Sequence, residues 1–385
     1  MTKAPRLKGR ITEITLRGFR SLKSVEGLQL PQLSVLIGAN GVGKSGFIRF
    51  FEMLGWMFRA KNLQEFVIRH GGGDDQFFMG ARQTPVIIGE VKIETEIGYN
   101  DYRLELTHLS AGDSLMVYKE SYRYSRKNKD SVAAWTTIDT LGKESMLPEQ
   151  QNKTAGIIYS LLMQCVTYQF HDTSDNADIH KRWDVSDNTR LRADGGNLAA
   201  VLFYLKNNDS PRYKHIVRLI KRVLPTFSDF VLEPVANKVL LRWKGSHSDK
   251  IFGSHLTSDG SLRLFCLLTL LNLSDDHLPD VLFLDEPELG LHPHAITLLA
   301  DMMKRVSKTR QIFIATQSPY MVDCFELDNI IIAESSDGAA QLRNLSSEEY
   351  KKWLDDDYLP SNIWLKTPIK NVALGINRVN ENEGE

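Results

Sequence analysis

Short, uninterrupted apolar runs near both ends of the chain predict buried strands. They cover residues 33–38 (LSVLIG), 281–284 (VLFL) and 311–316 (QIFIAT), and apolar residues at helical spacing follow at 44–59 and 294–308. A strand without polar alternation is typical of a sheet that is covered on both faces, as in a parallel sheet between helices. The two ends of the chain therefore predict one α/β core.

The middle of the chain has a different pattern, which divides that core in two. Residues 86–139 alternate apolar and polar positions in segments separated by polar turns, which predicts antiparallel strands. Helical periods return between residue 153 and about residue 222. We therefore expect an N-terminal part of the core at 1–60, an insertion with antiparallel strands and a helical lobe at 61–255, a C-terminal part of the core at 256–345, and a helical segment with an acidic tail at 346–385.

The composition is that of a folded globular protein with a large core, since the 385 residues are 42% hydrophobic and 25% charged. A net charge of −1 lacks the basic excess of a dedicated nucleic-acid binder. The 3 cysteines form no CxxC pair, which predicts neither a zinc site nor a disulfide framework and suits a reducing cytoplasm. The basic start is not a signal peptide, and no apolar run approaches the ~20 residues that span a bilayer. We expect a cytoplasmic protein without a membrane segment.

Residues 38–45, GANGVGKS, match the phosphate-loop pattern GxxxxGK[ST] in full. The loop follows a predicted buried strand and opens a predicted helix, which is the context that gives the pattern meaning. Glycines let backbone N–H groups surround phosphate oxygens, Lys44 would bridge the β- and γ-phosphates, and Ser45 would be a ligand of Mg²⁺. The pattern predicts a site for ATP with Mg²⁺. The expected nucleotide contacts are Gly38, Asn40, Gly41, Gly43, Lys44 and Ser45.

Two adjacent carboxylates, Asp285 and Glu286, follow the apolar run at 281–284. Ligands of open α/β sheets lie at the carboxyl edge of the strands, so both side chains are expected beside the phosphate loop. We predict that Asp285 holds Mg²⁺ through water and that Glu286 polarises the attacking water as general base. Upstream, Ser258 and Gly260 begin a Leu-rich helix, and such a helix start is another anion-binding end.

The order of these motifs carries a family resemblance. The phosphate loop, SDGS at 258–261, LDEPELGLHP at 284–293 and IATQSP at 314–319 resemble the ABC-type ATPases of the SMC, RecF and OLD group. More closely, the chain resembles the short bacterial ATPases of two-gene anti-phage systems. The resemblance implies an ABC-type P-loop ATPase head with a split α/β core, a mixed strand and helix insertion and no long coiled coil.

The same resemblance implies a homodimer or a multiple of dimers. Ser258 and Gly260 would belong to the signature motif, which contacts the γ-phosphate held by the other subunit. Gln317 falls where many ABC ATPases carry the switch histidine. A glutamine keeps a hydrogen bond to the γ-phosphate but has no titratable proton, so the expected hydrolysis is slow.

Two further positions are open at the level of sequence. Gln169, after the apolar residues at 165–168, is the candidate for the glutamine that ligates Mg²⁺ in ABC ATPases, and an ordinary loop residue is the alternative. Arg20, in GFRSL at 18–22, resembles the family's N-terminal motif near the nucleotide, and a surface turn is the alternative.

Features of the insertion and the C-terminus bear on partners. No heptad pattern is sustained, and the roughly 70 residues after Ser318 are too few for the TOPRIM nuclease domain of OLD proteins. The resemblance therefore implies a separately encoded effector, expected to be a TOPRIM- or HNH-like nuclease. Basic residues mixed with aromatics in the insertion fit either a nucleic-acid-facing surface or a solvated helix face. We predict a sensor or regulator ATPase of bacterial anti-phage defence, and the alternative is a RecF-like DNA-repair clamp.

Overall fold

The α/β core is one six-stranded sheet in the order β17-β16-β3-β15-β14-β8, in which β17 is the antiparallel strand at one edge. Its strands are β3 (Leu33–Ile37), β8 (Cys165–Tyr168), β14 (Val281–Asp285), β15 (Gln311–Thr316), β16 (Ile330–Ser336) and β17 (Ala339–Asn344). The computed structural model describes residues 9–127, 133–140, 142–247, 249–356 and 358–366. The expected α/β core with a mostly parallel sheet is confirmed.

Both faces of this sheet are covered, as the apolar runs predict. Phe283 of β14 packs into the core on one face, beneath α1 (Lys44–Gly55), and its ring stacks on that of Phe51 with centroids 4.6 Å apart. Leu284 packs into the core on the other face, under α6 (Asp259–Leu270) and α7 (Pro293–Val306). The helix that follows the phosphate loop and the helix that begins at Ser258 therefore lie on opposite faces of one sheet.

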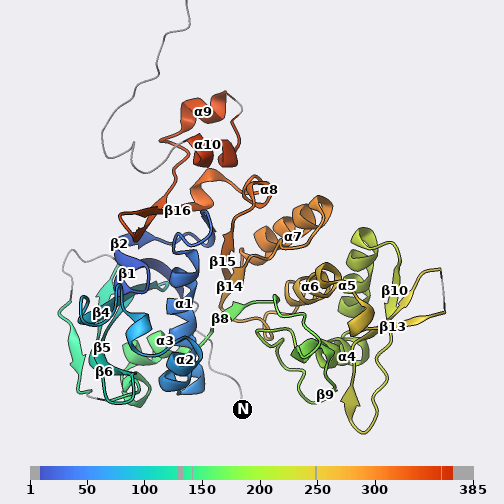
Figure 1. Ribbon diagram of the computed structural model, residues 1–385, viewed down its shortest axis with the longest axis horizontal. Helices are drawn as coiled ribbons and strands as arrows, with labels where there is room; N and C mark the ends of the chain where they lie inside the picture. The colour runs from blue at the N-terminus through green and yellow to red at the C-terminus, as the bar shows by residue number, and fades with distance from the viewer. Residues whose placement is uncertain (1–8, 128–132, 141, 248, 357, 367–385) are drawn as a thin grey trace, which may run out of the picture.

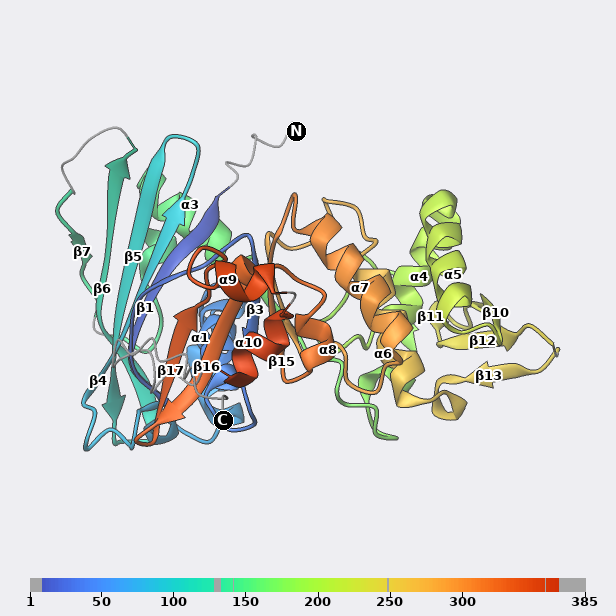
Figure 2. The same cartoon turned by 90° about the horizontal axis from the view of Figure 1, so that it is seen from above.

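A second six-stranded sheet, entirely antiparallel and in the order β2-β1-β4-β5-β6-β7, packs on α1 from the side away from the core sheet (Figures 1 and 2). Its strands are β1 (Arg10–Phe19), β2 (Leu22–Gln29), β4 (Val86–Glu94), β5 (Gly98–Leu109), β6 (Ser114–Arg126) and β7 (Thr136–Ile138). A Cβ on Gly89 would lie 2.4 Å from Cζ of Phe50, so glycine makes room there for the helix to approach. Helices α2 (Leu63–Arg69) and α3 (Lys153–Leu162) complete this lobe.

A lobe of helices and short strands surrounds α6 on the other side of the core sheet (Figure 1). Helices α4 (Leu198–Asn208) and α5 (Ser210–Val223) pack on each other and on α6. The short strands are β9 (Trp183–Asp184), β10 (Phe227–Phe230), β11 (Lys238–Val239), β12 (Arg242–Gly245) and β13 (Ile251–Gly253). The chain continues through α8 (Pro319–Val322), α9 (Lys351–Asp355) and α10 (Pro360–Lys366), and the predicted acidic tail lies outside the described residues.

The arrangement departs from the expected division of the chain at β8. This strand lies inside residues 61–255, yet it is an edge strand of the core sheet and pairs with β14. The expected insertion is thus two separate lobes, one before β8 and one after it.

Strand β2 was not predicted, because its residues LKSVEGLQ do not alternate between apolar and polar positions. Its pairing with β1 contains a register shift. No helix in the described part of the chain is both long and apolar enough to cross a membrane.

Candidate nucleotide-binding site

The loop between β3 and α1 depends on glycine for two different reasons. A Cβ on Gly38 would lie 2.3 Å from the carbonyl oxygen of Ala333 in β16, so no side chain fits there. Gly41 and Gly43 have φ of +79° and +110°, in the region that glycine enters without steric cost. Gly43 is the N-cap of α1, and no side chain of the described residues caps the helix. The first N–H groups of α1 are therefore left for a ligand at the carboxyl edge of the core sheet.

Lys44 is buried at the start of α1. Its ammonium donates to the carbonyl oxygens of Gly38 at 2.6 Å and Ala39 at 2.9 Å. Burial lowers the pKa of Lys44, while the neighbouring carboxylates of Glu286, Asp285 and Glu288 act to raise it. The lysine and three carboxylates thus gather at the same edge, as expected for the phosphate loop and the residues after β14.

Gln169 and Asp285 meet across the two parallel strands that precede them. Gln169 follows β8, Asp285 ends β14, and Nε2 of Gln169 donates to Oδ2 of Asp285 at 3.0 Å. Burial raises the pKa of the Asp285 carboxyl, against the opposing effects of His171, Arg49 and the hydrogen bond from Gln169. The amide and the carboxylate are separated by 116 positions in sequence, and the parallel register of β8 and β14 brings them together.

Glu286 has an unusual backbone conformation. Its φ is +41°, which is rare for a residue with a side chain, and its N–H donates to the carbonyl oxygen of Ala315 at 2.8 Å. The hydrogen bond extends the β14–β15 ladder by one residue before the chain turns away. Backbone strain of this kind persists where the surrounding structure enforces it, which is common at functional sites.

A buried carboxyl links the residues after β14 to the end of β15. Glu288 is 8% exposed, and its Oε1 accepts a hydrogen bond from the Thr316 hydroxyl. Burial raises the pKa of Glu288, and Oε2 has no hydrogen-bond partner among the described residues. Thr316 also accepts a hydrogen bond from the N–H of Ser318 at 2.9 Å, so it fixes the turn that contains Gln317. Gln317 follows β15, whose neighbours are β3 and β14, and therefore lies at the same edge of the sheet.

Ser258 and Gly260 begin α6 as the sequence predicts. Ser258 is exposed and is the N-cap, with its hydroxyl accepting a hydrogen bond from the N–H of Ser261 at 3.3 Å. A Cβ on Gly260 would lie 2.4 Å from the carbonyl oxygen of Gly290, so the start of α6 packs directly on the loop after Glu288. This close approach requires glycine at position 260.

Arg263, one turn into α6, is a residue that the sequence reasoning missed. Its guanidinium donates to the carbonyl oxygens of Phe170 at 3.0 Å, His171 at 3.3 Å and Leu289 at 3.2 Å. The side chain therefore joins the segment after Gln169 to the loop after Glu288. The only signal in the sequence is an arginine five positions after Ser258, which has no meaning until the three loops are placed in space.

Arg20 lies in the β1–β2 turn, with φ of +51°. Its guanidinium donates to Oε1 of Gln76 at 3.0 Å and to the carbonyl oxygen of His70 at 2.9 Å, and burial lowers its pKa. The neighbouring Ser21 contacts the phosphate loop, because its Oγ lies 3.1 Å from the position of a Cβ on Gly43. The structure therefore commits Arg20 to other partners, and its contact with nucleotide stays a prediction.

The residues at this edge fit a magnesium ion bound together with nucleotide. Mg²⁺ prefers oxygen ligands and in such sites takes most of them from phosphates and water, so one or two protein groups suffice. Asn40 is exposed on the loop, Ser45 is exposed in the first turn of α1, and Asp285 with Gln169 supplies carboxylate and amide oxygens at the same edge. Ser45, Asp285 and Gln169 are the residues that would hold the ion, which would neutralise charge on the β- and γ-phosphates.

Fold and site together define an ATPase domain with a phosphate loop. The chain belongs to the family described as "AAA domain, putative AbiEii toxin, Type IV TA system", which matches residues 33–323. It is similar to an Smc head bound to the C-winged helix domain of ScpA, with a TM-score of 0.57 and 17% identity over 89% of this chain and 99% of that chain. It is also similar to an Smc head domain with an extended coiled coil, bound to the C-terminal domain of ScpA derived from Pyrococcus furiosus, with a TM-score of 0.54 and 15% identity over 90% and 99%. These likenesses show the fold of an SMC-type head.

Proposed function

We propose that this chain is an ATP-driven switch of bacterial anti-phage defence. It binds ATP with Mg²⁺, hydrolyses it slowly in a site that a second copy completes, and controls a separately encoded effector in the cytoplasm. The observation that carries the nucleotide part is the hydrogen bond from Gln169 to Asp285, beside buried Lys44 at the carboxyl edge of the core sheet. An amide and a carboxylate placed together next to a phosphate loop suit a nucleotide with its metal.

The proposed hydrolysis gives each side chain at this edge one task. Lys44 leaves the carbonyl oxygens of Gly38 and Ala39 and binds the β- and γ-phosphates. Glu286 accepts a proton from the attacking water, and Gln317 hydrogen-bonds the γ-phosphate. Because Gln317 has no titratable proton in the pH range of the cell, it can orient but cannot take up a proton, which favours slow turnover.

A second copy is needed because α1 and α6 cover opposite faces of the core sheet. Ser258 is exposed at the start of α6, which favours a contact with nucleotide held by another chain over a contact with the chain's own phosphate loop. A two-fold arrangement would then make two equivalent composite sites, each with the phosphate loop of one subunit and Ser258 with Gly260 of the other.

The effector is assigned to another chain because the residues gathered at the site account for nucleotide chemistry and not for damage to a target. The family description names a putative toxin of a toxin–antitoxin system, which supports a defence setting. We infer that a nuclease of the TOPRIM or HNH class docks on one of the two lobes that flank β8 or on the C-terminal helices. ATP would regulate the effector only if the open and closed dimers bind it with different affinity.

The test is to purify the chain alone and together with the product of its neighbouring gene, and to measure ATP turnover and cleavage of DNA and RNA for each. We expect ATP turnover by the chain alone, and nucleic-acid cleavage only with the neighbour. Robust cleavage by the chain alone, unaffected by active-site substitutions in the neighbour, contradicts the switch. Absence of ATP turnover in every combination contradicts the ATPase itself.

A second candidate, a RecF-like DNA clamp, is favoured by the solvent face of α5. This helix contains no acidic residue, and its exposed basic side chains have no carboxylate partner in the described ranges. They are Lys214, Arg218, Lys221 and Arg222. ATP-dependent retention of duplex DNA by the purified chain, weakened by Lys221→Glu and by added salt, would favour the clamp.

A further inference from the structure

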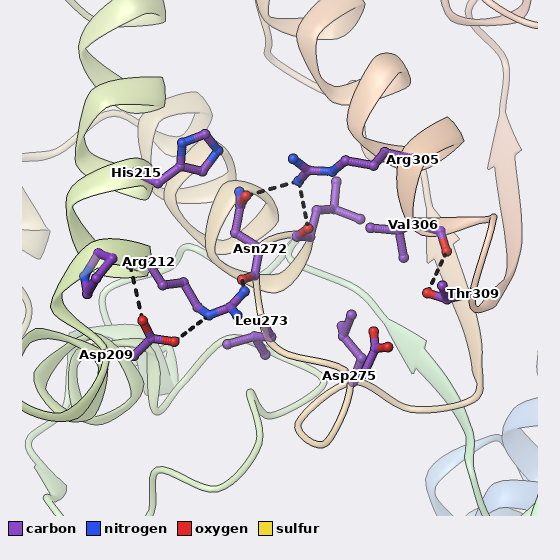
Figure 3. A pocket seen from close by; sticks show the side chains of 12 residues that line it. Asp209, Arg212, His215, Asn272, Leu273, Asp275, Arg305, Val306 and Thr309 are labelled. Carbon is purple, nitrogen blue, oxygen red and sulfur yellow. Dashed lines mark hydrogen bonds and ion pairs between the residues drawn. The ribbon is translucent and has the colours of Figure 1, made fainter.

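An open pocket of about 490 Å³ lies at the amino-terminal end of the core strands. The phosphate loop lies at the opposite, carboxyl edge of the same sheet. It is bounded by the start of α5, the end of α6, the loop before β14 and the last turn of α7 (Figure 3). Its volume lies within the range of small-molecule sites. The lining combines polar groups with an apolar wall formed by Pro211, Leu271, Leu273, Leu278 and Val306.

Two arginines enter this pocket from different helices and meet at the end of α6. Arg212 of α5 donates to the carbonyl oxygen of Asn272 at 2.5 Å, and Arg305 of α7 donates to Oδ1 of Asn272 at 3.0 Å. Arg212 also pairs with Asp209 at 2.7 Å. Arg305 has no carboxylate partner in the described part of the chain, and its recorded acceptors are the neutral oxygens of Leu271 and Asn272. One guanidinium of the pair is therefore without a counterion.

The pKa of His215 reflects the charged side chains around this pocket. Burial lowers the pKa of its imidazole, and Arg218, Arg305 and Arg212 lower it further. The largest charge effects on His215 thus come from arginines, although Asp209 also lines the pocket. Asp275, the other lining carboxylate, lies 3.9 Å from Arg310 outside this group. Among the charged side chains that line the pocket, Arg305 is therefore the cation without a carboxylate partner in the described chain.

We propose that this pocket binds a small phosphate-bearing molecule of mononucleotide size, at a site separate from the phosphate loop. Guanidinium groups match phosphate oxygens in geometry, and a charged acceptor forms stronger hydrogen bonds than the neutral oxygens of Leu271 and Asn272 that Arg305 now uses. The neutral imidazole of His215 adds a donor, and the apolar wall suits the face of a base.

The position of the pocket connects it to the signature helix. Asn272 and Leu271, which now accept the hydrogen bonds of both arginines, directly follow α6, whose first residues are at Ser258 and Gly260. A phosphate that recruits the arginines would release the carboxyl end of α6. This regulatory consequence rests on the proposed function, whereas binding itself does not.

Binding is tested by calorimetric titration of AMP, inorganic phosphate and adenosine into the full chain carrying Lys44→Ala, which removes phosphate binding at the loop. We expect one AMP per chain, competition by inorganic phosphate and no binding of adenosine. Arg305→Ala should weaken AMP binding by about 10-fold or more, since a charge-assisted hydrogen bond is lost. His215→Glu should abolish it, because a carboxylate at this position repels phosphate and pairs with the arginines that would bind it.

Arg222→Ala is the matched control, since it removes the same charge from an exposed position near the end of α5, outside the pocket lining. It should leave AMP affinity unchanged. The proposal is overturned if AMP gives no saturable binding up to millimolar concentration, if adenosine binds as well as AMP, or if Arg222→Ala weakens binding as much as Arg305→Ala. Failure of Lys44→Ala to reduce ATP binding would contradict the nucleotide assignment and leave the pocket test intact, because the pocket variants are compared in one background.

Discussion

Nε of Arg263 donates a hydrogen bond to the carbonyl oxygen of Phe170 at 3.0 Å, across 93 positions of sequence. The same guanidinium reaches the carbonyl oxygens of His171 and Leu289. One side chain of α6 therefore holds both the segment after Gln169 and the loop between Glu288 and α7. Movement of α6 against the core sheet has to displace these loops or break the three hydrogen bonds.

Arg263→Ala should lower ATP turnover by about 10-fold or more, with a smaller effect on ATP affinity. The reason is that a small displacement of the loops that Arg263 holds slows the reaction more than it weakens ATP binding. Arg263→Lys is the second variant to measure. A lysine ammonium cannot reproduce the planar guanidinium that donates to three carbonyl oxygens, so turnover should not be restored. Steady-state kcat and KM for ATP decide this. A full rescue by lysine would show that only the charge is needed.

Substitutions of Lys44 and Glu286 should affect ATP binding and ATP hydrolysis separately. Lys44→Ala should abolish ATP binding, because the loop loses the cation that faces the β- and γ-phosphates. Glu286→Gln should retain binding and lose turnover by about 10²–10⁴-fold, as expected for loss of a general base. ATP affinity by calorimetry and phosphate release measure the two effects. Unchanged turnover in Glu286→Gln would refute the assignment of Glu286.

Assembly should depend on ATP and on the start of α6. With Glu286→Gln to prevent hydrolysis, ATP should give a stable dimer or a multiple of it by mass photometry. Gly260→Ala should weaken this state, since its Cβ would lie 2.4 Å from the carbonyl oxygen of Gly290 and displace that loop. Gly156→Ala is the control, because a Cβ there meets no atom within 4 Å. A monomer of the Glu286→Gln chain under saturating ATP would contradict the composite site.

Glu288 should make stability depend on pH. Burial raises its pKa in the folded chain, so the folded state binds the Glu288 proton more tightly than the unfolded state does. Its contribution to stability therefore falls as pH rises from the unfolded pKa through the folded one. Glu288→Gln removes this ionisation, so its Tm relative to the wild type should increase as pH rises above the ordinary pKa of a glutamate. Thermal unfolding at several pH values checks the trend, with Glu348→Gln, at an exposed position, as control.

The sequence by itself determined the local parts of the site. The apolar runs predicted buried strands, because a strand covered on both faces needs no polar alternation. GANGVGKS, together with Asp285 and Glu286, predicted which edge of the sheet carries the nucleotide site. Gly43 and Lys44 have their expected places because the loop and the helix start depend only on neighbouring residues.

The tertiary structure decided what joins these parts. Strand β8 is a member of the core sheet although it lies inside the expected insertion, and only its parallel register beside β14 brings Gln169 to Asp285. Arg263 acquires three acceptors from loops that approach it in space and not in sequence. Contacts of this kind depend on the packing of distant segments, and a single sequence carries no periodicity or spacing that records them.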